Sequence, residues 1–554
     1  MPTSRKSKLQ SDIKEKYNAQ KILFDSGETR SFEWREKQLK QVLKFLEEEY
    51  SEISAALTAD LGKCAFEGEI TEIEVVRQEC LEALHSFRSW SSSTSVPSPG
   101  VLMPAYCSLR KEPRGVTLNI GPFNYPFSIG FGPAVTAFAA GCTVVLKPSE
   151  ACTETDKMLR KLVPKYFDPA VCTVVSGGIP EATELLSLRW GLIFFTGSET
   201  VGKIIASAAS KTLSPVVLEL GGKAPLIISR DAPEIKAMAD RVMWGKTINA
   251  GQTCVAPDYV MVHEDRVEDV VDAFKKALVD MFGETVEEIK NSSFARNVSS
   301  ASTSRLISMI SDAESNGGKI LTGGTEHADV KEKFIPPTLI LNPGKESKVL
   351  TEEIFGCVLP IVPYSTEAEC VSFINSVNGI STPLALYVFT TNDEEFKRYM
   401  DKIPSGDAVQ NDVLVHFACS TIPFGGMGTS GYGQAHGKYG FDAFTHTRGV
   451  LSKPCRQAFE FAGIRYPPYD KYGGWSGKVF KTLARVLPEI PVMHSKVIGR
   501  VLGTAAAAVV MGVIFKRTGV GKDVVDTAMG GVRMGLGIIG GTMEELGGWI
   551  KNAI

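Results

Sequence analysis

Two spacings of apolar residues alternate along the chain. Between residues 30 and 90 apolar side chains recur every three or four positions, as in FEWREKQLKQVLKFLEEEY at 32–50. That spacing gives an α-helix one apolar stripe, so we expect amphipathic helices packed on a larger body. The stretch SSSTSVPSPG at 91–100 breaks the pattern, because its Ser and Pro residues disfavour a helix, and it predicts an extended linker.

From residue 116 onward the apolar residues form short uninterrupted runs that end at Gly or Pro. The first five runs are VTLNI at 116, TVVLKP at 143, CTVVSGG at 172, LIFFTG at 192 and VVLELGG at 216. Such runs are typical of parallel strands buried on both faces. Because helical stretches separate them, they predict a doubly wound α/β sheet whose ligand lies at the carboxyl ends of the strands.

A second α/β pattern covers about 224–420. Its apolar runs are PLIIS, YVMVH, TLILN, VLPIV and LALYVF. We therefore expect a second domain that faces the first across a cleft. After about residue 467 the composition changes to a Gly- and Ala-rich tail.

Composition narrows the classes of function. A chain of 554 residues with 44% hydrophobic content is long enough for several domains. A net charge of −3 gives no electrostatic footprint for nucleic acid, so no nucleic-acid partner is expected. The 11 cysteines include no CxxC pair and no zinc-type spacing, which indicates reduced thiols and no metal site. The polar N-terminus has no apolar signal-peptide core.

Three residues near strand ends or turns are candidates for chemistry. Cys254 in GQTCVAP is either a nucleophile or a small packing residue, and the stretch alone leaves both open. Asn124 in GPFNYPF is either a hydrogen-bond donor to a ligand or a turn residue. Glu219 in VVLELGG is either a surface glutamate or a base, and a charge inside a buried run favours the base.

A Gly-containing turn suggests a phosphate site. GSETVG, from Gly197 to Gly202, follows the run LIFFT and opens a helical stretch. The free N–H groups at such a helix start can bind a pyrophosphate.

Seven motifs together resemble a known family. GPFNYPF, LKPSE, FTGSETVG, LELGGK, GQTCVAPDY, EEIFG and PFGGMGTSGYG occur in the order found in NAD(P)-dependent aldehyde dehydrogenases, over about residues 20–468. WGKTINAGQTCVAPDY, NDVLVHF and RYPPY are similar to the class 3 branch, which includes fatty aldehyde dehydrogenases. The resemblance implies a Rossmann-like cofactor domain, an α/β catalytic domain, a β-rich oligomerisation segment and a homodimer.

The resemblance also implies approximate domain boundaries. Residues 1–222 would be mainly the NAD(P)-binding domain, with about 96–112 in the oligomerisation segment. Residues 223–415 would form the catalytic domain, 416–468 would return to the oligomerisation segment, and 469–554 would be a C-terminal extension.

By resemblance, three residues divide the chemistry. Cys254 attacks the aldehyde to form a thiohemiacetal, whose oxyanion is held by the Asn124 amide and the Cys254 N–H. Hydride transfer to the nicotinamide leaves a thioester, and Glu219 acts as the base for its hydrolysis.

The same resemblance implies a site for NAD or NADP, between which the sequence does not decide. Gly197, Ser198 and Gly202 would lie at the pyrophosphate, and Lys147 and Glu150 near the adenosine ribose. Two residues of EEIFG complete the set, Glu353 at the other ribose and Phe355 beside the nicotinamide.

The apolar character of the C-terminal tail is relevant to the kind of aldehyde that the enzyme would oxidise. Residues 501–515, VLGTAAAAVVMGVIF, carry no charge but fall short of the about 20 apolar residues of a spanning helix. A membrane anchor or hairpin, an interfacial helix and a soluble extension all stay open. An anchored enzyme with a cytosol-facing catalytic domain would suit lipophilic aldehydes.

We therefore expect oxidation of a long-chain aldehyde to its acid. An apocarotenoid or other polyene aldehyde is the alternative substrate. A CoA-acylating dehydrogenase would not need the base Glu219, and a non-catalytic scaffold would not need Cys254, Asn124 and Glu219 together.

Overall fold

The computed structural model describes residues 2–98, 102, 105–379, 382–456 and 466–468. Contacts along the chain divide it into two units. The larger comprises Met1–Ser91 and Glu112–His446, and the smaller Ser92–Lys111 and Thr447–Ile554. The apolar stretch at 501–515 lies outside the described residues.

Helices open the larger unit, as the apolar spacing between residues 30 and 90 predicted. They are α1 (Pro2–Asp25), α2 (Phe32–Glu48), α3 (Tyr50–Leu61), α4 (Ala65–Gly68) and α5 (Glu74–Trp90), with a π-helical turn at Glu69–Ile73 before α5. The Ser31 side chain caps α2 by accepting the Trp34 N–H, and the apolar stripe of α2 is buried. Helix α1 was not predicted, because its first residues are mainly polar.

One six-stranded sheet contains the five runs predicted first. Its order is β15-β7-β6-β3-β4-β5. The strands are β3 (Val116–Ile120), β4 (Thr143–Lys147), β5 (Cys172–Val174), β6 (Leu192–Gly197), β7 (Val216–Leu220) and β15 (Gly431–Tyr432). All pairs are parallel except β15 with β7. The predicted doubly wound α/β sheet is therefore confirmed.

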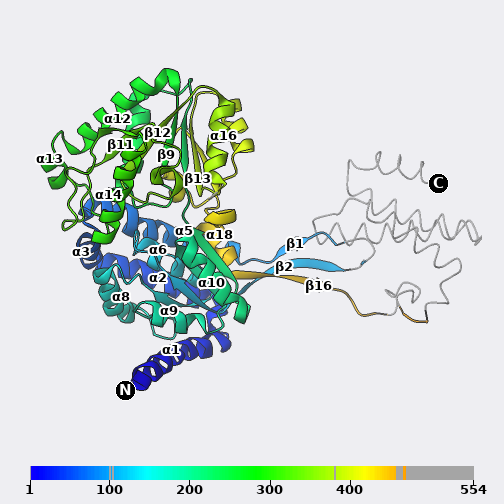
Figure 1. Cartoon of the computed structure of the whole chain (residues 1–554). Coiled ribbons are helices and arrows are strands. Elements are labelled where there is room, and N and C mark those ends of the chain that lie inside the picture. The colour runs from blue at the N-terminus through cyan, green and yellow to red at the C-terminus, as the bar shows by residue number, and fades with distance from the viewer. Residues whose placement is uncertain (1, 99–101, 103–104, 380–381, 457–465, 469–554) are drawn as a thin grey trace, which may run out of the picture. The chain divides into compact units, whose positions relative to one another are not determined.

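Helices cover both faces of this sheet (Figure 1). They are α6 (Ser128–Phe131), α7 (Pro133–Ala140), α8 (Thr153–Tyr166), α9 (Ile179–Leu186) and α10 (Glu199–Thr212). Alternate residues of β6 go to opposite cores: Phe194 belongs to the apolar cluster that includes residues of α2, α7 and α8, and Ile193 to the cluster that includes residues of α1, α9 and α10. Burial on both faces explains why the strands are mainly apolar.

A seven-stranded sheet contains the second set of predicted runs. Its order is β10-β11-β12-β9-β8-β13-β14. The strands are β8 (Pro225–Ile228), β9 (Tyr259–His263), β10 (Lys319–Thr322), β11 (Thr338–Leu341), β12 (Val358–Tyr364), β13 (Ala385–Phe389) and β14 (Asp407–Gln410). The edge strands β10 and β14 were missed, because neither is fully buried and neither forms an apolar run.

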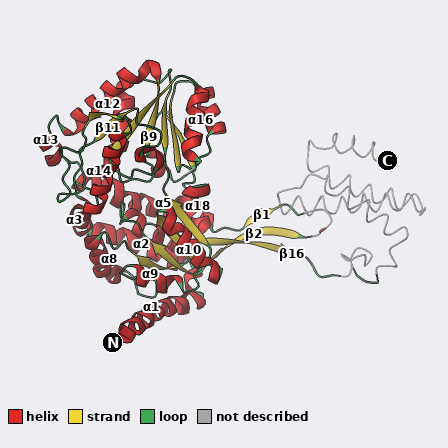
Figure 2. Ribbon diagram, in the orientation of Figure 1, coloured by secondary structure: helices red, strands yellow, loops and turns green. Residues whose placement is uncertain are grey.

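Helices also flank the second sheet (Figure 2). They are α11 (Ile235–Thr247), α12 (Val267–Phe282), α13 (Val286–Asn291), α14 (Ser300–Ser315), α15 (Lys348–Thr351), α16 (Glu367–Asn378) and α17 (Asp393–Lys402). Helix α18 (Gly437–Ala443) instead packs on α5 and α7, beside the first sheet. Helix α12 packs on the face that carries Val260 of β9, and α16 on the face that carries Tyr259. No helix among the described residues is long and apolar enough to cross a membrane.

A three-stranded sheet joins β1 (Thr94–Val96), β2 (Tyr106–Pro113) and β16 (Thr445–Ser452) in that order. Strand β1 pairs antiparallel with β2, with Val96 opposite Cys107. Part of the predicted linker at 91–100 is therefore a strand, because its Thr and Val residues have a partner for pairing. The domain boundaries drawn from the sequence stay predictions.

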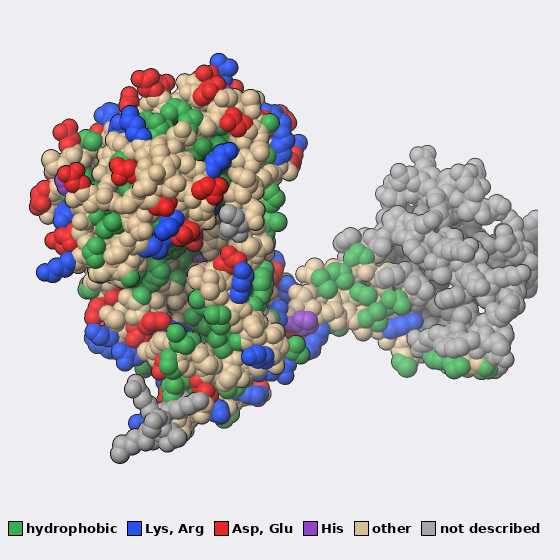
Figure 3. All heavy atoms as spheres, in the orientation of Figure 1, with side chains coloured by type: hydrophobic (Ala, Val, Ile, Leu, Met, Phe, Trp, Pro, Cys, Tyr) green, Lys and Arg blue, Asp and Glu red, His purple; other side chains and the backbone are tan. Residues whose placement is uncertain are grey.

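Charged side chains are mixed over the visible face of the larger unit. In Figure 3, acidic and basic groups alternate there without a large patch of one sign. This distribution agrees with the small net charge of the chain.

Candidate active site

The loop that carries Cys254 follows α11 and has an unusual backbone. A 3-10 turn at Ile248–Gly251 contains three successive left-handed residues, Asn249 (φ 54°), Ala250 (φ 53°) and Gly251 (φ 75°). Left-handed conformations are uncommon for residues other than Gly and cost about 1 to 3 kcal/mol each. Surrounding contacts must therefore hold this loop in place.

Gln252 supplies several of those contacts. Its amide nitrogen donates to the carbonyl oxygens of Asn249 and Arg296, both at 3.0 Å. Its side-chain oxygen accepts the Val298 N–H at 2.8 Å. Buried polar groups that are fully paired fix a segment strongly, so Gln252 sets the position of Cys254 two residues later.

Cys254 and Glu219 line one cavity of about 40 Å³. Its other lining residues include the aromatic side chains Phe194, Phe417 and Phe424 and the titratable side chains Glu79 and His436. A volume of this size holds more than one water molecule, since a single water needs about 10–15 Å³. The structure thus brings together the two residues that the sequence assigned to attack and hydrolysis.

Asn124 reaches the same loop from the segment after β3. Its side-chain nitrogen donates to the Gln252 carbonyl oxygen at 3.0 Å. An amide nitrogen has two hydrogens, so this bond leaves one for another acceptor.

Glu219 lies in β7 as a buried carboxyl. Neither of its oxygens has a hydrogen-bond partner among the described residues. Burial raises the pKa of this carboxyl well above its ordinary value, and the Asp407 carboxylate raises it further. Such an unpaired buried acid is costly for the fold, which points to a chemical role.

The surroundings of the Cys254 thiol disfavour its thiolate form. Burial raises its pKa to about 12, and the carboxylates of Glu353 and Glu219 add to the effect. The thiol is therefore protonated near neutral pH, and attack requires a group that takes its proton.

The residues predicted near a pyrophosphate lie between β6 and α10. Ser198 caps α10, where its hydroxyl oxygen accepts the Val201 N–H at 3.4 Å. A Cβ on Gly202 would lie 2.8 Å from a Leu220 methyl carbon, so glycine allows α10 to pack closely on β7. The open N-terminus of this 14-residue helix fits a dinucleotide phosphate.

The residues predicted near a ribose lie in two places: Lys147 and Glu150 at and after the end of β4, and Glu353 between α15 and β12. Lys147 ends β4, and its buried amine bonds the Glu150 carboxylate at 2.6 Å. Glu353 accepts the Gly222 N–H at 3.1 Å, and a Cβ on Gly221 would lie 2.3 Å from a Glu353 oxygen. At each place a carboxylate oxygen is available in a polar setting, and such an oxygen can accept a hydroxyl of a ligand.

Two further observations concern the EEIFG loop. Burial raises the pKa of Glu353 to about 7, and the Asp258 carboxylate adds to this effect while Lys223 opposes it. Phe355 has a left-handed backbone (φ 48°) and packs edge-on against Phe123, with 5.6 Å between ring centroids.

A family model described as "Aldehyde dehydrogenase family" matches residues 4–450. The chain belongs to the aldehyde dehydrogenase family. It is thus an NAD(P)-dependent aldehyde dehydrogenase, and the predicted fold and enzyme class are confirmed.

Individual relatives match more than four fifths of this aldehyde dehydrogenase. A 4,4'-diaponeurosporen-aldehyde dehydrogenase from Staphylococcus aureus is 38% identical over 457 residues, which is 82% of this chain and 96% of the relative. Aldehyde dehydrogenase family 3 comG from Dictyostelium discoideum is 41% identical over 456 residues, 82% of this chain and 94% of the relative. The predicted class 3 resemblance is therefore confirmed.

A mammalian relative and a solved structure also support membership of the aldehyde dehydrogenase family. The dimeric NADP-preferring aldehyde dehydrogenase of Canis lupus familiaris is 38% identical over 458 residues, 83% of this chain and 98% of the relative. The substrate-bound state of Staphylococcus aureus AldH matches with a TM-score of 0.79 and 37% identity, and covers 85% of this chain and 99% of that one.

Several polar residues of this aldehyde dehydrogenase site were not predicted. Glu79 and His436 line the cavity with 3.8 Å between a carboxyl oxygen and Nδ1. Asp407 lies with one carboxyl oxygen 3.8 Å from Nε2 of His416. Sequence gave no signal for Glu79 or Asp407, because one is a polar position of an amphipathic helix and the other begins a short edge strand.

Proposed function

We propose that this enzyme oxidises a lipophilic, long-chain aldehyde to the carboxylic acid, with Cys254 as nucleophile, Asn124 as oxyanion donor and Glu219 as hydrolytic base. One observation carries the assignment: the buried carboxyl of Glu219, which has no hydrogen-bond partner within the described part of the chain, lines the same cavity as the Cys254 thiol. The aromatic side chains around that cavity suit an apolar substrate.

The first step places charge on the aldehyde oxygen. As the Cys254 sulfur bonds to the carbonyl carbon, the thiol proton leaves for Glu219, and the oxygen becomes an oxyanion. The Asn124 amide and the Cys254 N–H stabilise it, at about 3 kcal/mol per donor. Bound NAD(P)⁺ supplies the oxidant that takes up a hydride.

The second step releases the acid from the thioester on Cys254. Glu219 must first return its proton to solvent, and its ionised form then takes a proton from a water molecule in the cavity. The water oxygen bonds to the acyl carbon, the carbon–sulfur bond breaks, and the thiol is restored. A raised pKa makes the Glu219 carboxylate a stronger base near neutral pH than an exposed glutamate.

For the cofactor, the chain offers two groups of residues. The N-terminus of α10, with Gly197, Ser198 and Gly202, would hold the pyrophosphate. Lys147 and Glu150 would lie at one ribose, whereas Glu353 would hold the other with Phe355 beside the nicotinamide.

A polyene aldehyde is the second candidate substrate. The Staphylococcus aureus relative is named for 4,4'-diaponeurosporen-aldehyde, and its 38% identity supports this alternative. The name of the canine relative, which includes "dimeric", supports a homodimer. We also propose membrane association through the tail, on the ground that residues 501–515 carry no charge.

A substrate panel tests the proposal. NADH or NADPH formation is measured with short aliphatic aldehydes, hexadecanal and a polyene aldehyde, each with and without CoA. Turnover should be fastest with a lipophilic aldehyde and independent of CoA. A preference for short aldehydes would contradict the substrate class, and a requirement for CoA would contradict hydrolysis.

Two variants test the residue roles. Cys254→Ser should abolish oxidation, while the matched change Cys419→Ser, at an exposed thiol, should leave it unchanged. Glu219→Gln should retain some first-turnover NADH formation but slow steady turnover by about 10² to 10⁴-fold. Normal steady turnover of the Gln variant would exclude Glu219 as the base.

A further inference from the structure

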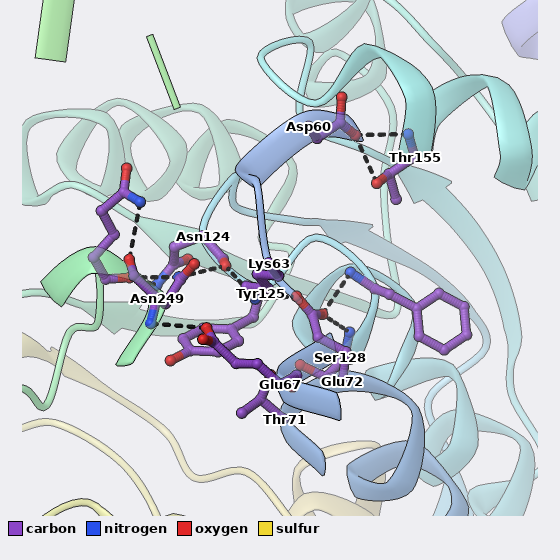
Figure 4. A network of polar contacts seen from close by, with 12 residues as sticks. Asp60, Lys63, Glu67, Thr71, Glu72, Asn124, Tyr125, Ser128, Thr155 and Asn249 are labelled. Carbon is purple, nitrogen blue, oxygen red and sulfur yellow. Dashed lines mark hydrogen bonds and ion pairs between the residues drawn. The ribbon is translucent and has the colours of Figure 1, made fainter. Parts of the chain in front are cut away.

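A fully buried ion pair, Lys63 with Glu72, contacts the main chain of Asn124. The Lys63 amine and a Glu72 carboxyl oxygen are 2.6 Å apart, and both side chains have 0% exposure (Figure 4). Removing two charges from water is costly, and an apolar pair of similar size is often at least as stable. The pair therefore needs an explanation other than fold stability alone.

The pair holds both ends of the segment 124–128. The second Glu72 oxygen accepts the N–H groups of Phe127 at 3.0 Å and Ser128 at 2.8 Å. The Lys63 amine donates to the Asn124 carbonyl oxygen at 3.2 Å. It also lies 4.2 Å from the centroid of the Tyr125 ring, a distance that suits a cation–π contact.

The opposite side of the segment contacts the Cys254 loop. The Asn249 side chain donates to the Asn124 carbonyl oxygen at 2.8 Å. The Tyr125 hydroxyl is hydrogen-bonded to the Thr253 hydroxyl at 2.7 Å, one residue before Cys254. The segment thus lies between the ion pair and the loop that bears the nucleophile.

We propose that Lys63 and Glu72 are positioning residues for the oxyanion hole: they fix the main chain at 124–128 so that the Asn124 amide lies beside Cys254. This inference rests on the proposed role of Asn124. Neither charged side chain touches a reacting atom. Each binds the main chain that carries the donor, and Lys63 also contacts the Tyr125 ring.

The chemistry of the segment explains why a charged pair is used. Two N–H groups at residues 127 and 128 need an acceptor, and the carbonyl at 124 needs donors. One carboxylate and one ammonium satisfy all three groups at once, and their mutual attraction fixes the spacing between them. With an apolar pair the N–H groups at 127 and 128 would lose their acceptor, and the carbonyl at 124 would retain only the Asn249 amide.

A double-mutant cycle separates positioning from general stability. The variants are Asn124→Ala, the uncharged pair Lys63→Met with Glu72→Gln, and the combination of all three. The measurement is the single-turnover rate of NADH formation with saturating cofactor. Asn124→Ala should slow this step by about 10² to 10³-fold.

The uncharged pair should slow the same step by about tenfold or more, because a small misplacement of a catalytic group is costly. In the Asn124→Ala background it should add less than about threefold, since the group that it positions is already gone. Full additivity would overturn the positioning role while leaving the role of Asn124 intact. A normal rate for Asn124→Ala would contradict the proposed function as well.

Asp60→Ala is the matched control. Asp60 accepts the N–H groups of Glu154 and Thr155 and the Thr155 hydroxyl, and does not contact the segment 124–128 in Figure 4. This change should lower the thermal midpoint without slowing NADH formation. An equal slowing by Asp60→Ala would show a general effect of destabilisation and overturn the proposal.

The single variant Glu72→Gln provides a second test, which applies if the double replacement does not fold. It retains an acceptor oxygen for the segment but removes the charge that pairs with Lys63. The single-turnover rate should fall by more than about threefold, with the affinity for the cofactor unchanged. An unchanged rate in a folded Glu72→Gln variant would overturn the proposal.

Discussion

Replacement of Glu353 by Gln should stabilise the cofactor-free enzyme, and the gain should increase with pH. The pKa of Glu353 is raised from 4.5 to about 7 by burial and by Asp258. Because the folded-state pKa is the higher one, the folded enzyme resists ionisation of this carboxyl. The associated stability is complete below pH 4.5 and is lost as the pH rises to about 7.

The magnitude follows from the two values. A difference from 4.5 to about 7 corresponds to roughly 3 kcal/mol, at about 1.4 kcal/mol per pH unit. Glutamine does not ionise, and it retains an oxygen that can accept the Gly222 N–H. The variant should therefore gain roughly 2.5 kcal/mol relative to wild type between pH 5 and pH 8.

Urea unfolding without cofactor at several pH values between 5 and 8 measures this difference. Glu352→Gln is the matched control, because the neighbouring side chain is exposed and should give no pH-dependent gain. A gain for Glu353→Gln that is constant with pH, or that decreases as pH rises, would refute the reasoning.

Two more changes test other parts of the structure. Asp407→Asn removes a charge that raises the pKa of Glu219, so the rising limb of the kcat–pH profile should move to lower pH, and a move to higher pH would contradict this coupling. Gly431→Ala should lower the free energy of unfolding by at least about 2 kcal/mol, because a Cβ there would lie 1.9 Å from the Leu218 carbonyl oxygen at a φ of +121°. The matched change Gly449→Ala meets no atom within 4 Å and should cost much less in the same urea titration, whereas equal losses would show that the contact at Leu218 is not responsible.

Buried strands were predictable because a strand that packs on both faces is apolar at most of its positions. Strands β3, β4 and β6 to β9 show this clearly. The edge strand β14 begins with Asp407, and β15 has only two residues, so neither carries an apolar run. Their place in a sheet depends on neighbours that are distant in the sequence.

The residues of the candidate site also differ in whether the sequence predicts their roles. Cys254, Glu219 and Asn124 lie in motifs whose resemblance to a family suggests their roles. Lys63 and Glu72, by contrast, look like ordinary charges of an amphipathic helical region. Helical spacing shows which positions share a face of a helix. It does not show that the segment 124–128 covers Lys63 and Glu72 and excludes water from them.

The contact between Gly251 and Gly356 limits how this site can change. A Cβ on Gly251 would lie 2.5 Å from the Gly356 carbonyl carbon and oxygen, and a Cβ on Gly356 would lie 2.5 Å from a Leu306 methyl carbon. The loop of the thiol and the loop of Glu353 therefore cross with no space for a side chain at either glycine. In evolution or in engineering, a substitution that reshapes the EEIFG loop at this crossing also displaces the thiol. The position of the Glu353 loop and the position of the nucleophile are therefore constrained by the same contact.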